Sequence, residues 1–128
     1  MQGLINKARK HRALIIDLRN NRGGAEETLM YMLGGIFDHE VKIGDKVMRS
    51  DREPLIAKPL HSSFPAKLVV LIDSTSMSAA ELFSRVVQLE KRGIVMGDQS
   101  AGRVMRAKRY QHKLFESAVY YGVSVADG

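Results

Sequence analysis

The sequence predicts an α/β fold, because short apolar strands alternate with amphipathic helices along the chain. Two continuous apolar runs, 13–18 (ALIIDL) and 68–72 (LVVLI), are rich in branched residues. Runs of this kind are typical of parallel strands that are covered on both faces. Each run leads into a Gly- or Ser-rich turn and then into a helical pattern, so both segments are expected to form strand–turn–helix units.

Composition limits the classes of protein that this chain can represent. Its 128 residues are enough for one domain with one core, and 45% hydrophobic with 27% charged residues is an ordinary globular mixture. No apolar run reaches the roughly 18 residues of a membrane span. The absence of cysteine excludes disulfides and thiolate metal sites. A net charge of +6 is moderate and indicates no particular partner.

Each helix is predicted from apolar residues at helical spacing. The first is expected after Gly24, with Glu26 and Glu27 in its first turn, where the helix dipole favours acidic groups. Its apolar face contains Leu29, Met30, Leu33, Ile36 and Phe37. The second begins near Ser78 and ends before Lys91-Arg92-Gly93, and its apolar face contains Ala79, Leu82, Phe83, Val86 and Val87.

The remaining segments carry weaker patterns. Residues 94–96 are expected to form a third short strand, and 41–49 and 119–126 further strands, because apolar and polar residues partly alternate there. Residues 51–66 contain all three prolines and are expected to form an irregular surface excursion. A helix-like segment at 4–10 leads directly into the first strand, and the chain ends after a strand-like run. Residues 1–128 are therefore expected to be the single core of a larger domain, without its flanks.

Ser78 has two physical interpretations. A serine between a buried strand and a helix N-terminus is well placed as a nucleophile, because the free N–H groups of the helix can stabilise an oxyanion beside it. The sequence Ser78-Ala79-Ala80-Glu81 also fits a capping box, in which Ser78 and Glu81 satisfy the first N–H groups of the helix. The spacing alone favours the capping box.

The other turn contains the paired glycines of Asn21-Arg22-Gly23-Gly24. Paired glycines allow backbone N–H groups to face an anion or a carbonyl oxygen, although a tight strand-to-helix connection needs them as well. Neither a G-x-G-x-x-G nor a G-x-x-x-x-G-K-[ST] motif is present, so the sequence gives no specific support for nucleotide binding.

Three ordered motifs resemble the carboxyl-terminal processing, or tail-specific, serine proteases. They are 13–24 (ALIIDLRNNRGG), 68–81 (LVVLIDSTSMSAAE) and 97–103 (GDQSAGR). The resemblance implies a crotonase- or ClpP-like α/β fold of stacked, twisted strands with flanking helices. It also implies serine-type endopeptidase activity on protein or peptide substrates, without a cofactor or a metal, and a location outside the cytoplasm. The oligomeric state cannot be predicted.

The resemblance also implies roles for individual residues. Ser78 matches the nucleophile, and backbone N–H groups at Ala79 and at Gly23 or Gly24 match the oxyanion hole. Arg103 stands at the position of the family's general-base lysine. An arginine cannot act as that base, because its pKa is above 12.

No other residue of the chain is assigned as the base. Lys108 would face the opposite side of a regular strand from Arg103. The tricorn-like branch of the family uses a histidine from earlier in the domain, supported by a later acid. None of the four histidines of this chain fits that role by its position: His11, His39, His61 and His112.

Two alternatives to an active protease remain. The first is a catalytically inactive, crotonase-like binding module of the same family, with a groove for peptides or apolar ligands; Arg103 motivates it. The second is a nucleic-acid-binding domain, which rests on the basic cluster of 103–113. That cluster could also seat a substrate's terminal carboxylate. A solvated strand face is favoured over both, and the few aromatic residues nearby provide little stacking for single-stranded nucleic acid.

Overall fold

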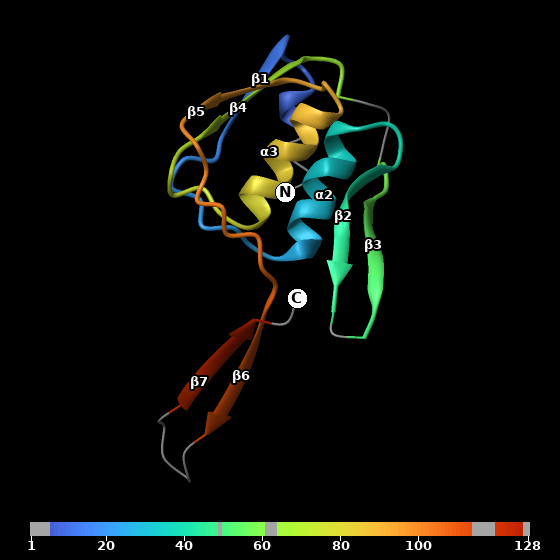
Figure 1. Cartoon of the computed structure of the whole chain (residues 1–128). Helices are drawn as coiled ribbons and strands as arrows, with labels where there is room; N and C mark the ends of the chain where they lie inside the picture. Colours follow the sequence, from blue (N-terminus) through green and yellow to red (C-terminus); the bar gives the residue numbers. More distant parts are fainter. Residues whose placement is uncertain (1–5, 49, 61–63, 114–119, 127–128) are drawn as a thin grey trace.

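The computed structural model describes residues 6–48, 50–60, 64–113 and 120–126. Its body is a three-stranded parallel sheet in the order β1-β4-β5, with two helices packed on one face (Figure 1). The α/β prediction is therefore confirmed. No helix among these residues is long and apolar enough to cross a membrane.

The elements follow one another in the order that the sequence predicts, with one additional strand. They are β1 (Ala13–Asp17), α2 (Glu26–Ile36), β2 (Val41–Val47), β3 (Arg52–Ala57), β4 (Lys67–Ile72), α3 (Ala79–Leu89), β5 (Ile94–Gly97), β6 (Ala107–Lys113) and β7 (Tyr120–Ala126). Of the helix-like segment predicted at 4–10, residues 6–8 are helical and residues 9–10 form a turn, and residues 4–5 lie outside the described residues.

The register of the parallel sheet places the two predicted turns side by side. Ile15 lies opposite Val69 and Asp17 opposite Leu71, so β1 and β4 run parallel and end at the same edge of the sheet. The turns that leave these strands at their carboxyl ends are therefore neighbours. This edge is where ligands bind in open α/β sheets.

The core lies between the sheet and the helices. Leu33 and Ile36 of α2 pack with Val86 and Val87 of α3, and Val70 of β4 is completely buried beneath them. These residues are on the apolar helix faces that the sequence predicts. Glu26 and Glu27 occupy the first turn of α2, also as predicted.

The expectation that the strands are covered on both faces is wrong for the structure described. On the face away from the helices, the exposed fraction is 64% for Ile15, 62% for Ile94 and 54% for Met96. Apolar composition predicts the strand but cannot distinguish a covered face from an open one, because the same residues suit both faces of a parallel sheet.

The prediction of an irregular excursion over 51–66 is also wrong in part. Residues Arg52–Ala57 form β3, which pairs antiparallel with β2 in a two-stranded sheet. Pro54 lies opposite Asp45 in this pair. Proline is compatible with a strand that has a neighbour on one side only, because its missing N–H can face away from that neighbour.

The strands β6 and β7 form an antiparallel hairpin that extends away from the body (Figure 1). The strands predicted at 41–49 and 119–126 are found as β2 and β7; residues 49 and 119 lie outside the described residues. The basic cluster of 103–113 was expected on one strand face. The corresponding strand, β6, begins only at Ala107, so Arg103 and Arg106 precede it.

Candidate active site

The two strand-to-helix turns at the carboxyl ends of β1 and β4 are joined by backbone hydrogen bonds. The N–H of Leu18 donates to the carbonyl oxygen of Leu71 at 2.8 Å, and the N–H of Met77 donates to that of Asn21 at 3.0 Å. The hydroxyl of Ser76, which is completely buried, donates to the carbonyl oxygen of Leu18 at 2.7 Å. The turns therefore form one structural unit.

Asp73 is the polar centre of this unit. Its carboxylate accepts from the hydroxyl and N–H of Thr75, from the N–H of Ser76 and, across the two turns, from the N–H of Asn20 at 3.1 Å. The hydrogen bonds from Thr75 and Asn20 stabilise the charged form and lower the pKa of Asp73 to about 2. The ionised carboxylate thus connects the end of β4 to the glycine-containing turn.

Ser78, directly before α3, has a strained backbone. Its φ of 55° and ψ of −121° lie in a region that residues with a Cβ rarely adopt. Such a conformation costs on the order of 1–3 kcal/mol and persists only where the surroundings enforce it. A serine in a strained strand-to-helix turn is the arrangement that presents a nucleophilic hydroxyl in several hydrolases.

Gly23 lies directly against the side chain of Ser78. A Cβ at Gly23 would be 2.7 Å from Cβ of Ser78 and 3.2 Å from its Oγ, and the φ of +93° itself favours glycine. The N–H of Gly23 donates to Oδ1 of Asn21 at 2.8 Å. A Cβ at Gly24 would have no neighbour within 4 Å. The two glycines therefore differ: one allows close contact, and the other lies in open space.

The capping box predicted for α3 is present. Oε2 of Glu81 accepts from the N–H of Ser78 at 2.8 Å. The same N–H also donates to the carbonyl oxygen of Arg103 at 3.1 Å. The N–H of Ser78 is thus satisfied within the protein, and Ala79 provides the next N–H of the helix.

Glu81 has further partners that the capping box does not require. Its carboxylate, in a residue that is only 8% exposed, also accepts from the hydroxyl of Ser100 and from the N–H groups of Gly102 and Arg103. Burial by itself raises the pKa of Glu81, but these hydrogen bonds together outweigh it and leave the pKa lowered. The carboxylate is therefore held ionised beside Ser78.

Ser78 opens onto a cavity of about 530 Å³ between α2, α3, β2 and the segment 104–107. Gly24, Ala25 and Ala79 line it beside Ser78. Apolar side chains form much of the remaining wall: Leu29, Ile43, Leu55, Leu82, Val104 and Met105. A cavity of this size, in which apolar and polar groups are combined, is compatible with a ligand site.

Most of the charged groups in the cavity wall are paired. Lys46 lies 2.6 Å from Glu26, which begins α2. Asp45 lies 2.7 Å from Lys42 and 2.6 Å from Arg52, and these two cations lower its pKa, Lys42 more strongly. These ion pairs therefore join β2 to α2 and β3, whereas Glu27 and Arg106 also line the cavity and take part in none of these pairs.

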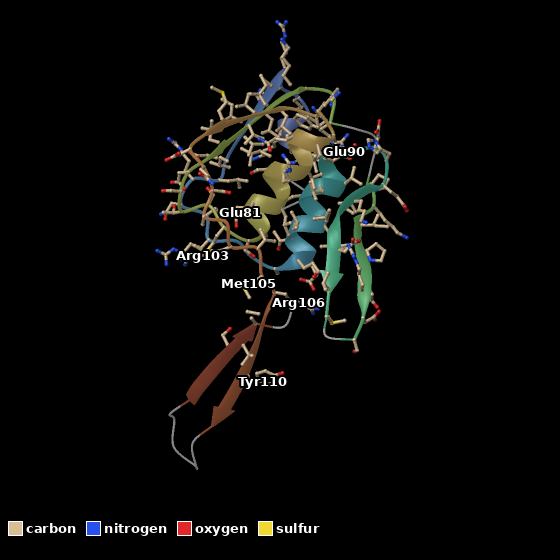
Figure 2. The ribbon with its side chains drawn as sticks, viewed as in Figure 1. Glu81, Glu90, Arg103, Met105, Arg106 and Tyr110 are labelled. Atoms are coloured by element: carbon tan, nitrogen blue, oxygen red, sulfur yellow. The ribbon has the colours of Figure 1, made fainter. Side chains whose placement is uncertain are left out.

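Arg103 reaches the site through its backbone. Its carbonyl oxygen accepts from Ser78 and its N–H donates to Glu81, whereas its exposed side chain is not part of the cavity wall. Arg106, three residues later, lines the cavity (Figure 2). The side chain of Lys108 lies outside the described part of the structure.

Neither histidine whose side chain is described lies near Ser78. His39 is 2.9 Å from Asp38, whose hydrogen bond raises the pKa of the imidazole, and 3.7 Å from Glu90 at the opposite end of α3. His11 precedes β1, at the edge of the sheet away from the two turns. The side chains of His61 and His112 lie outside the described residues.

The sequence interpretation missed Asp73, and it identified Glu81 only as a helix cap. The role of Asp73 could have been inferred in part, because an aspartate followed by Ser or Thr at a strand end predicts a side-chain-closed turn. The bonds of Glu81 to residues 100–103 have no local sequence signal, because they join segments about twenty residues apart.

Comparisons with known proteins identify the family of this chain. A model of peptidase family S41 matches residues 1–124. The tail-specific protease of Haemophilus influenzae is 33% identical over 100 residues, which cover 73% of this chain and 14% of that protein. The chain therefore spans only a small part of this relative.

Solved structures resemble the chain in fold. The photosystem II D1 C-terminal processing protease gives a TM-score of 0.66 at 24% identity, over 98% of this chain and 32% of its own. Mature CPAF gives 0.71 at 14% identity, over 97% of this chain and 38% of its own. The tricorn protease gives 0.54 at 20% identity, over 78% and 9%. The predicted family resemblance is confirmed: the family model covers nearly the whole chain, and the chain belongs to peptidase family S41.

Proposed function

We propose that this chain is the core of a serine endopeptidase in which Ser78 attacks the scissile carbonyl of a protein or peptide substrate. The observation that carries the proposal is the strained backbone of Ser78, which lies at a helix N-terminus on the wall of the cavity. Membership of a peptidase family supports the same chemistry.

The oxyanion would be held by the N–H groups of Ala79 and Gly24. The N–H of Ser78 is already bonded to Glu81 and Arg103, and that of Gly23 to Asn21. Within the described residues, the N–H groups of Ala79 and Gly24 have no acceptor, and both residues line the cavity. Two unused donors at the N-terminus of a helix and at a glycine turn suit a developing negative charge.

The general base in this proposal comes from outside the 128 residues. Arg103 cannot accept the proton of Ser78, and neither described histidine lies near it. A histidine with a supporting acid, as in the tricorn-like branch that the sequence resembles, is the expected arrangement. The chain would then act as part of a larger protease domain.

A fluorophosphonate probe tests the nucleophile directly. The chain, the longer parent protein and their Ser78→Ala variants are treated with the probe, and covalent attachment is measured by intact mass. We expect the parent to be labelled and its Ser78→Ala variant to remain unlabelled while its circular dichroism stays native. Labelling that persists in Ser78→Ala would overturn the assignment, and labelling of the short chain would place a base within it.

Arg103 favours a second candidate, a binding module of the same fold that has lost catalysis. The cavity and the two free N–H groups would then hold a peptide without cleaving it. The two candidates predict different results for the parent protein. A folded parent that binds peptides but does not react with the fluorophosphonate probe supports the binding module. Nucleic-acid binding has no comparable support, and the absence of salt-sensitive filter binding to DNA or RNA would remove it.

The family resemblance also implies a location outside the cytoplasm, and this location is part of the proposal. Fractionation of cells that express the parent protein tests this part of the proposal, and recovery with the cytoplasmic fraction alone would contradict it.

A further inference from the structure

Glu81 makes contacts that a helix cap does not explain. A capping glutamate needs one acceptor atom for one N–H group. Here both carboxylate oxygens are used twice: Oε2 accepts from the N–H groups of Ser78 and Arg103 at 2.8 and 3.0 Å, and Oε1 accepts from the hydroxyl of Ser100 and the N–H of Gly102 at 2.8 and 2.7 Å. Three of the four donors belong to the segment 100–103, which lies outside the helix.

The chemistry of this arrangement requires a carboxylate. Three of the four partners are backbone N–H groups, which can only donate, and they contact both oxygens. A glutamine has one acceptor oxygen and one NH₂ group, so in either orientation its NH₂ group would face at least one of these N–H groups. A simple capping box, by contrast, accepts Glu or Gln in this position.

The position of Glu81 in the fold gives these bonds a consequence for the cavity. Figure 2 shows Glu81 at the end of α3 that faces the segment leading to Arg103. Directly after Arg103 come Val104, Met105 and Arg106, which form one wall of the cavity onto which Ser78 opens. Glu81 therefore holds the nucleophile turn with one oxygen and the start of this wall with both.

We infer that Glu81 is a positioning residue that fixes the segment 100–106 against the nucleophile turn, and thereby sets the geometry of Ser78 and the width of the adjacent cavity. This inference rests on the proposed function insofar as Ser78 is the reacting group. Glu81 does not touch the substrate in this scheme. Its carboxylate acts through the backbone of Ser78 and Arg103.

The test is Glu81→Gln in the parent protein and in this chain. We expect the rate of fluorophosphonate labelling of Ser78 in the parent to fall roughly 10- to 100-fold, because small misplacements of a reacting group have effects of this size. Ser84→Ala is the matched control. It removes one buried hydrogen bond from the same helix, the 2.8 Å bond to the carbonyl oxygen of Ala80, and should leave the labelling rate unchanged.

Amide hydrogen exchange of this chain gives a readout that does not depend on activity. In Glu81→Gln, protection of the Gly102 and Arg103 amides should fall roughly tenfold or more, while the amides of β4 keep their protection. Unchanged protection at both residues would overturn the inference, and so would an unchanged labelling rate in a labelled parent. If wild-type Ser78 is never labelled, the proposed function fails, and hydrogen exchange alone decides whether Glu81 holds the segment.

Ser100→Ala keeps the inference testable if Glu81→Gln does not fold. It removes one of the four donors and leaves the carboxylate in place. We expect a smaller decrease in both the labelling rate and the protection of Gly102. No change in either measurement would contradict the positioning role.

Discussion

The two strand-to-helix turns at the carboxyl ends of β1 and β4 are neighbours, and each contains a residue with positive φ where the two turns meet. In the turn after β1, the residue with positive φ that lies against the other turn is a glycine, Gly23, with a φ of +93°. In the turn after β4, the residue with positive φ is Ser78, with a φ of 55°, although glycine would adopt this conformation more easily. The first turn avoids strain, and the second retains it.

The difference shows which turn needs its side chain. Asn20 also has a positive φ, of 57°, but asparagine tolerates this region better than most residues. Serine has no such advantage, so a strained serine points to a use for its hydroxyl. Gly23 contributes in the opposite way, because the absence of its Cβ makes room for the Ser78 side chain.

The largest expected effect comes from adding a Cβ to the first turn. Gly23→Ala would place a methyl group 2.7 Å from Cβ of Ser78 at a φ that alanine rarely adopts. We expect a loss of stability on the order of 2–4 kcal/mol and the loss of probe labelling. Urea unfolding and intact-mass labelling measure the two effects.

Gly24→Ala is the matched control for this change. The added Cβ has no neighbour within 4 Å and the backbone needs no positive φ, so the stability should change by roughly 0.5 kcal/mol or less. If the two variants are equally stable, the proposed packing of Gly23 against Ser78 is wrong.

The second-largest loss of stability is expected from Asp73, whose carboxylate links the two turns. Asp73 has a pKa of about 2 in the folded protein against an ordinary value of 3.8, so protonation favours the unfolded state. Its contribution is complete above about pH 4 and is lost as the pH falls through 2. Asp73→Asn should destabilise the protein at pH 7, less than Gly23→Ala does, because the amide retains one acceptor oxygen.

The pH dependence separates this link from a general loss of structure. Between pH 4 and pH 2, the unfolding free energy of wild type should decrease more steeply than that of Asp73→Asn, which has no carboxyl group to protonate at this position. Urea unfolding at several pH values measures the slopes. Parallel slopes would show that the two turns do not depend on an ionised Asp73.

The fold was predictable where the sequence pattern is local. Continuous apolar runs identified β1 and β4, and helical spacing identified α2 and α3. β3 was missed because Pro54 breaks the strand pattern, and only the pairing with β2 in three dimensions reveals a tolerated edge position. The open face at Ile15 was missed because an apolar strand has the same composition whether or not that face is covered.

The site was predictable to the same extent. The pair Ser78 and Glu81 is three residues apart, so the capping box could be read from the sequence. The same spacing says nothing about Arg103 and Gly102, which reach Glu81 only because β5 returns the chain beside β4. Backbone strain at Ser78 is likewise a property of the folded chain.

The smallest expected effect measures that strain directly. Ser78→Gly and Ser78→Ala both remove the hydroxyl and should both abolish labelling, but only glycine accepts a φ of 55° and ψ of −121° without strain. Relief of about 1–3 kcal/mol of strain outweighs the greater freedom of glycine in the unfolded state, which costs about 0.5–1 kcal/mol. Ser78→Gly should therefore be the more stable variant by about 1 kcal/mol in urea unfolding.

At Ser84, further along α3, the order of stability of the glycine and alanine variants should be the reverse of that at Ser78. Ser84 has an ordinary helical position, where glycine is about 1 kcal/mol less favourable than alanine. Ser84→Gly is thus expected to be the less stable member of its pair, and Ser78→Gly the more stable member of its own. If alanine is better at both positions, the backbone of Ser78 is not strained. The contrast between the two turns would then lose its physical basis, even if Ser78 reacts with the probe.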